Sequence, residues 1–138
     1  MQEADNTKVV QEAYASFGRG DVQGILDRLD DNIVWIGVYG ASQAPQSGER
    51  RGKAAVGQFF SQVAQHVNFS RFEPKEFIAT GDKVVAIGHY AATTSVGKPF
   101  DADFAMVFTL KNGKVVRFQE FTDSAQVNES YTPVATTA

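Results

Sequence analysis

The chain has 138 residues, of which 43% are hydrophobic and 21% charged, and its formal net charge is −3. These values predict one folded domain with a single core, and they exclude a disordered chain. The weak negative charge and the lack of a basic stripe argue against nucleic acid and anionic membrane surfaces as partners.

The absence of cysteine excludes disulfides, thiolate chemistry and cysteine-ligated zinc. The polar, acidic N-terminus lacks the basic flank and apolar core of a signal peptide, and no apolar run approaches the ~20 residues of a membrane span. We therefore expect a cytoplasmic protein that does not contact a membrane. The two histidines belong to no ligand motif, and no dinucleotide or phosphate-binding motif is present, so we expect neither a metal nor a cofactor.

Two helices are expected at the start of the chain. The first spans residues 6–17, because apolar residues recur there at three- and four-residue spacing. These residues are Val9, Val10, Ala13, Tyr14 and Phe17. Gly18 ends this helix, and Asp21 caps a shorter one that runs to about residue 29.

A short β-branched strand and a long loop follow. The strand, 33–36, contains Trp35, which is either a core residue or part of a pocket wall. The segment 37–52 is rich in Gly, Ser, Gln and Pro and predicts an irregular loop. Loops of this length are typical of lids and binding loops, with disorder as the alternative. Tyr39 is the residue in this loop that is best able to close over a ligand.

After a third helix over 53–65, four strands are expected to form a meander. They span residues 68–80, 83–94, 100–110 and 114–123. Pro74 predicts an edge position or a bulge in the first of them. Helices followed by an antiparallel meander are typical of α+β folds, in which the helices pack on one face of a curved sheet. We expect the domain to cover residues 1–125, followed by a polar, mobile tail, 126–138.

The hairpin around Asn112-Gly113 has two possible registers, a two-residue type I′ turn or a type I turn with a glycine bulge. They differ by one residue, which decides the side chains that share a face. We prefer the bulged turn, in which Leu110 pairs with Lys114, because it separates apolar from polar residues. Its apolar face carries Phe104, Met106, Phe108, Val116, Phe118 and Glu120, and its polar face carries Asp101, Asp103, Thr109, Arg117, Gln119 and Asp123.

Glu120 is the one charged residue on this apolar face. A carboxylate beside an apolar cavity has its pKa raised toward neutrality, as a general acid or base requires. The alternative is a structural carboxylate that bonds backbone donors or water. If Ser95-Val96-Gly97 is also a bulged turn, Tyr90 joins the same face and could donate a hydrogen bond to Glu120. Gly88 would then lie opposite Phe104 and leave room for a ligand.

Several segments resemble the nuclear transport factor two-like superfamily, also called cystatin-like, and within it the SnoaL-like and ketosteroid isomerase-related proteins. They are Gly52-Lys53-Ala54-Ala55-Val56, Gly81-Asp82-Lys83-Val84-Val85, Gly97-Lys98-Pro99-Phe100 and the run from Asn112 to Asp123. The resemblance implies a cone-shaped, curved antiparallel sheet wrapped around the N-terminal helices, with an apolar internal pocket. It covers about residues 5 to 125.

The resemblance also implies a function and a partner. SnoaL-like cyclases use an acid/base carboxylate in an apolar pocket without a cofactor, which Glu120, with Tyr90, would supply here. The alternatives are a non-catalytic domain that binds a small ligand and a dimerisation module. A homodimer would form through the outer sheet face, with Val107, Val115 and Phe121. A small apolar molecule would contact Tyr14, Phe17, Trp35, Tyr39, Phe59, Phe60, Gly88, Phe104, Met106, Phe108 and Phe118.

Overall fold

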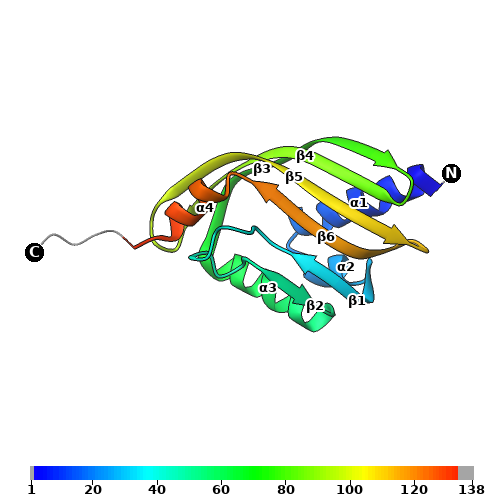
Figure 1. Ribbon diagram of the computed structural model, residues 1–138, viewed down its shortest axis with the longest axis horizontal. Coiled ribbons are helices and arrows are strands. Elements are labelled where there is room, and N and C mark those ends of the chain that lie inside the picture. The colour runs from blue at the N-terminus through cyan, green and yellow to red at the C-terminus, as the bar shows by residue number, and fades with distance from the viewer. Residues whose placement is uncertain (1, 134–138) are drawn as a thin grey trace, which may run out of the picture.

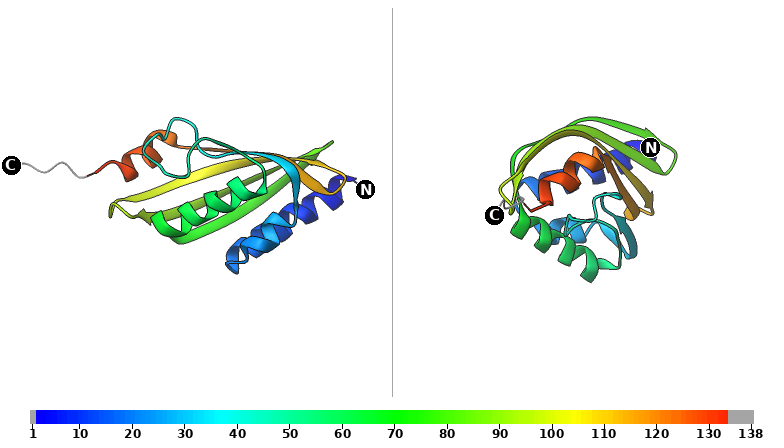
Figure 2. Two further views of the ribbon diagram at one scale, coloured as in Figure 1. Left: turned by 90° about the horizontal axis from the view of Figure 1, so that it is seen from below. Right: turned by 60° about the vertical axis from the view of Figure 1, so that its left-hand side comes forward.

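The computed structural model describes residues 2–133 and confirms the α+β prediction. A strongly curved sheet wraps around three helices, α1 (Gln2–Gly18), α2 (Val22–Leu26) and α3 (Lys53–His66) (Figures 1 and 2). A fourth helix, α4 (Ser124–Tyr131), lies at one end of the sheet (Figure 1). Buried apolar side chains from the helices and from the sheet pack together between these two layers.

Six strands form the sheet, in the order β2-β1-β6-β5-β4-β3. Their bounds are β1 Leu29–Ile36, β2 Glu49–Arg51, β3 Val67–Thr80, β4 Lys83–Thr94, β5 Pro99–Lys111 and β6 Lys114–Thr122. The four strands of the predicted meander pair antiparallel, and β1, whose partner the sequence did not indicate, runs parallel to β6. The sheet is open, with β2 and β3 as its two edges.

The second helix is shorter than the sequence predicts. Asp21 caps it as expected, because its Oδ1 accepts a hydrogen bond from the Gly24 amide at 2.9 Å. The helix ends at Leu26, whereas Leu29, expected in its last turn, begins β1 and pairs with Val115. The Val115 amide donates a hydrogen bond to the Arg28 carbonyl at 2.9 Å, so the chain joins the sheet here and the strand starts four residues early.

The β5–β6 hairpin corrects the predicted turn. Asn112 and Gly113 have φ angles of 52° and 77°, which is the pattern of a two-residue type I′ turn. Leu110 therefore pairs with Val115 instead of Lys114. A bulge between Thr109 and Leu110 then shifts the register by one residue, which returns the following β6 residues to the predicted faces. Only the residues within the bulge differ from the predicted faces. Val115 is buried inside the domain, and Val116, which was predicted on the apolar face, is half-buried.

Two further sequence expectations concern β3 and the C-terminal segment. The strand β3 is an edge strand with a bulge between Pro74 and Glu76, which confirms the prediction made from the proline. The segment 124–131 is the helix α4, with Val127 and Tyr131 only 2% and 4% exposed, instead of part of a mobile tail. The rest of the tail prediction, 134–138, lies outside the described residues.

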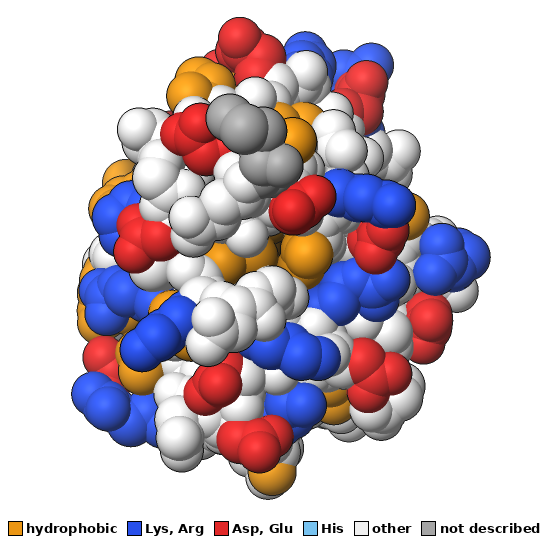
Figure 3. All heavy atoms as spheres, turned by 90° about the vertical axis from the view of Figure 1, so that its right-hand side faces the viewer, with side chains coloured by type: hydrophobic (Ala, Val, Ile, Leu, Met, Phe, Trp, Pro, Cys, Tyr) orange, Lys and Arg blue, Asp and Glu red, His pale blue; other side chains and the backbone are white. Residues whose placement is uncertain are grey.

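The surface carries mixed charges. On the face that holds the N-terminal end of the molecule, acidic and basic side chains are interspersed (Figure 3). Such a face has no single-sign field to attract a polyanion. Within residues 2–133, no helix is long and apolar enough to cross a membrane.

Candidate functional site

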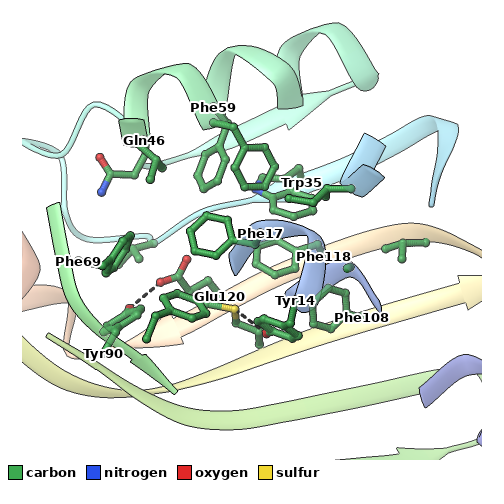
Figure 4. A pocket seen from close by; sticks show the side chains of 18 of the residues that line it. Tyr14, Phe17, Trp35, Gln46, Phe59, Phe69, Tyr90, Phe108, Phe118 and Glu120 are labelled. Carbon is green, nitrogen blue, oxygen red and sulfur yellow. Dashed lines mark hydrogen bonds between the residues drawn. The ribbon is translucent and has the colours of Figure 1, made fainter. Parts of the chain in front are cut away.

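A cavity of about 90 Å³ lies between the helices and the concave face of the sheet. By this measure a single water needs only about 10–15 Å³, so the space fits a small organic molecule. Ten residues that the sequence predicts at the site line this cavity, several of them visible in Figure 4. They are Tyr14, Phe17, Trp35, Phe59, Phe60, Tyr90, Met106, Phe108, Phe118 and Glu120.

Three residues predicted at the site lie elsewhere. Tyr39 is 54% exposed and borders a smaller cleft beside the end of β6. Phe104 is buried, and its ring stacks on Phe72 with 5.5 Å between the centroids. Gly88 does lie opposite Phe104, but a Cβ there would approach the Glu73 carbonyl oxygen to 2.2 Å. The missing side chain thus makes room for packed protein atoms, not for a ligand.

Aromatic rings form one wall of the cavity. The parallel pairing of β1 with β6 places Trp35 beside Phe118, and their rings stack with 3.8 Å between centroids. Phe59 and Phe60 of α3 pack their edges against the indole, at 5.5 and 5.6 Å. These contacts fix flat apolar surfaces that suit an apolar ligand.

Glu120 and Tyr90 form the polar part of the cavity. The Tyr90 hydroxyl donates a hydrogen bond to Glu120 Oε2 at 2.6 Å (Figure 4). Glu120 lies opposite Met106 on β5, not opposite Phe104 as the other register predicted. Burial raises the pKa of the Glu120 carboxyl, and the hydrogen bond from Tyr90 partly offsets this. Glu120 is the one charged side chain among the described residues that line the cavity.

Comparisons with known proteins agree with this geometry. A family model described as a SnoaL-like domain matches residues 10–118, which is most of the chain. The chain belongs to the SnoaL-like domain family. This confirms the resemblance seen in the sequence segments. A search among curated proteins gives no significant match.

Solved structures share the fold of this SnoaL-like domain over almost their full length. An NTF2-like protein from Burkholderia xenovorans LB400 is 27% identical, with a TM-score of 0.85 over 94% of this chain and 98% of that chain. An NTF2-like protein of unknown function from Burkholderia pseudomallei K96243 is 29% identical, with a TM-score of 0.85 over 93% and 98% of the two chains. TerC, crystallised with polyporic acid, is 26% identical, with a TM-score of 0.80 over 92% and 98% of the chains.

A second tyrosine of the SnoaL-like domain faces the same cavity. The Tyr14 hydroxyl donates to the Met106 sulfur at 2.9 Å, and a thioether is a weak acceptor (Figure 4). Burial, and to a lesser extent the charge of Glu120, raise the pKa of Tyr14 well above its ordinary value. Burial also raises the pKa of Tyr90. Both hydroxyls are therefore neutral hydrogen-bond donors at physiological pH.

Sequence reasoning missed several residues that line the cavity. Bulges in β3 break the alternation that would have assigned Phe69 and Phe72 to the inner face. Gln46 belongs to the loop that was predicted to cover the cavity, but its composition does not show which residue enters. The Gln46 amide donates to the Tyr131 hydroxyl at 2.7 Å, and α4 was not predicted as a helix. The other missed residues are Ala13, Ile25, Leu29, Val38, Val63, Phe100, Val115 and Val127.

No metal site is found in the part of the chain that the structure describes, because no three His, Asp or Glu side chains there could hold a metal ion together. The one histidine near two carboxylates, His89, lies on the outer face of the sheet. Its Nδ1 is 2.7 Å from Asp103 Oδ1, and its Nε2 contacts Asp101. The hydrogen bond to Asp103, followed by the other contacts with the two carboxylates, raises the pKa of His89.

Proposed function

We propose that this SnoaL-like domain is a cofactor-independent enzyme that moves a proton in a small, largely apolar carbonyl or hydroxyl compound, as isomerases and cyclases do. The observation that carries the proposal is the carboxyl of Glu120, bonded to Tyr90 at 2.6 Å and facing an apolar cavity. A group with a raised pKa in such a place is suited to both accepting and releasing a proton near neutral pH.

In the proposed reaction, Glu120 accepts a proton from the carbon next to a ligand carbonyl. The electron pair of that C–H bond moves into the carbonyl, and negative charge develops on its oxygen. Tyr14 supports this step, because within the described chain its hydroxyl donates only to a thioether, a weak acceptor, and it can donate to that oxygen instead. Tyr90 holds the carboxyl of Glu120 and partly offsets the rise in its pKa. Glu120 then returns the proton to a different carbon or to the oxygen.

Exchange of hydrogen for deuterium at the acidic carbons of β-tetralone tests this proposal without knowledge of the natural substrate. This apolar two-ring ketone is incubated with the protein in heavy water, and proton NMR follows the loss of signal. We expect saturable exchange that Glu120→Gln slows by about 100-fold or more, because a glutamine cannot act as a base. The rate should rise with pH through the raised pKa of Glu120, since only the ionised carboxylate accepts a proton.

The variant Tyr90→Phe tests whether the pKa of Glu120 sets the pH dependence of the exchange rate. It removes the hydrogen bond that lowers the pKa of Glu120, so the midpoint of the pH–rate profile should move upward. Exchange that is equally fast in Glu120→Gln would rule out the catalytic role. Saturable binding of β-tetralone without exchange would favour the second candidate, a domain that binds a small ligand without chemistry and uses the same apolar cavity.

We also propose a homodimer through the outer face of the sheet. Ile78 and Phe121 are each 49% exposed there, and Ile78 pairs with Val85, which pairs with Val107. A row of apolar side chains across neighbouring strands suits a self-complementary interface. Val115 takes no part, because it is buried inside the domain.

Sedimentation velocity tests the dimer. We expect the unmodified protein to sediment as a dimer and Phe121→Asp as a monomer, because two carboxylates would be desolvated at a symmetric interface. The control is Ser61→Asp, which adds the same carboxylate at an exposed position of α3, on the concave side of the sheet. A monomer at all concentrations of the unmodified protein would contradict the proposal.

A further inference from the structure

Loop 37–48 is packed closely onto the domain and has its own small core. Its ends are joined by a hydrogen bond from the Gly37 amide to the Gly48 carbonyl at 2.8 Å. Two alanines of the loop, Ala41 and Ala44, are only 0% and 3% exposed. The loop therefore has a defined conformation, and its Gln46 side chain lines the cavity.

One side chain outside the cavity determines the shape of the last turn of this loop. The Arg50 guanidinium donates hydrogen bonds to three consecutive carbonyl oxygens, at 2.9 Å for Pro45, 3.0 Å for Gln46 and 3.1 Å for Ser47. Three carbonyls that point at one centre repel each other unless a cation with several donors lies between them. The guanidinium serves them with two nitrogens held in one plane, Nη1 for Gln46 and Ser47 and Nη2 for Pro45, whereas the ammonium of lysine has a single nitrogen.

Arg50 also contacts the adjacent wall of the cavity. Its guanidinium carbon lies 5.3 Å from the centroid of the Phe59 ring, and Arg50 pairs with Trp35 in the β1–β2 ladder. Gln46, Phe59 and Trp35 all line the cavity. Figure 4 shows these three residues on one wall, facing the strands that carry Glu120 and Tyr90. One side chain thus joins the loop to α3 across from the carboxyl.

We propose that Arg50 is a positioning residue of the binding site, which holds loop 37–48 and Phe59 together as the wall that presses a ligand toward Glu120. This inference rests on the proposed function, because it assigns a role in ligand binding at the same cavity. In the described part of the chain, Arg50 forms no hydrogen bond with Glu120 or Tyr90. Its loss should therefore weaken binding and leave the proton-transfer step unchanged.

The test measures both steps in the full chain. Isothermal titration with β-naphthol, which resembles the enol of β-tetralone, gives the affinity, and the exchange assay gives KM and kcat. We expect Arg50→Lys to weaken β-naphthol binding and raise KM by about tenfold, because it loses the planar fork but keeps the charge. The value of kcat should stay within about twofold, because Glu120 and Tyr90 are unaltered.

The next residue provides a matched control. The Arg51 side chain is 73% exposed and pairs only with Glu49 in the described chain, at 2.9 Å, so Arg51→Lys should leave all three quantities unchanged. In Arg50→Ala, added ethylguanidinium should restore part of the lost affinity by occupying the place of the guanidinium. A merely structural loss would not respond to this cation. If Arg50→Ala does not fold, Arg50→Lys alone decides the matter.

Each outcome has a defined meaning. Equal affinity of Arg50→Lys and the unmodified protein would overturn the inference while the proposed function stands. A fall in kcat at constant KM would also overturn it, because the effect would then reach the carboxyl and not the wall. If the unmodified protein neither binds β-naphthol nor exchanges β-tetralone, the proposed function fails, and the role of Arg50 fails with it.

Discussion

Replacing Phe118 by alanine is expected to lower the free energy of unfolding by about 3–5 kcal/mol. Phe118 is 2% exposed, stacks on Trp35 at 3.8 Å and meets the edge of Phe108 at 5.1 Å. Its removal takes one ring from the aromatic wall of the cavity and enlarges that cavity. Because the cavity is already open on one side of the ring, few neighbouring side chains can move in to fill the space. Urea unfolding followed by circular dichroism gives the value.

The matched control lies one residue earlier on the same strand. The Arg117 side chain is exposed and, among residues 2–133, makes one hydrogen bond, to Gln119 at 3.3 Å, so Arg117→Ala should change the free energy of unfolding by less than about 0.5 kcal/mol. Phe118→Leu should fall between the two, because it keeps part of the buried apolar volume. Equal stability of the alanine variants at 117 and 118 would show that Phe118 contributes no more to the core than a surface residue.

The alternation of apolar and polar residues on β4, β5 and β6 predicted the inner face of the sheet well. The inward positions of Tyr90, Met106 and Phe118 follow from a period of two residues, which the burial of one face enforces strongly. The turn was predicted wrongly, yet the error did not reach Glu120. The bulge between Thr109 and Leu110 compensates for the different turn, because the core selects the register that buries the phenylalanines.

Features that depend on contacts distant in sequence could not be predicted. The amphipathic signal of α4 is weak, and its burial depends on contacts such as the hydrogen bond from the Thr94 hydroxyl to the Ser130 carbonyl, which lies 36 residues away. Gln46 enters the cavity from a turn whose carbonyls accept hydrogen bonds from Arg50, and in the sequence Arg50 is only one of a pair of arginines. The parallel pairing of β1 with β6 likewise joins strands more than 80 residues apart, without a local signal.

Replacing Gly88 by alanine is expected to destabilise the protein by about 3 kcal/mol, although the change adds only one methyl group. That methyl carbon would lie 2.2 Å from the Glu73 carbonyl oxygen, 2.7 Å from Phe104 Cζ and 2.8 Å from Pro74 Cα. Two of the three atoms belong to the backbone of the bulge in β3, which cannot move without breaking the β3–β4 ladder. Thermal and urea unfolding of the variant measure the loss.

A second glycine provides the opposite expectation for the same substitution. Gly57 lies inside α3, and an added Cβ would meet only Leu26 Cδ1, at 3.8 Å. Gly57→Ala should therefore stabilise the protein by about 0.5–1 kcal/mol, because alanine loses less backbone entropy in a helix. If Gly88→Ala were as stable as Gly57→Ala, β4 and the bulge of β3 would be further apart than the contacts require, and position 88 would have room for a ligand after all.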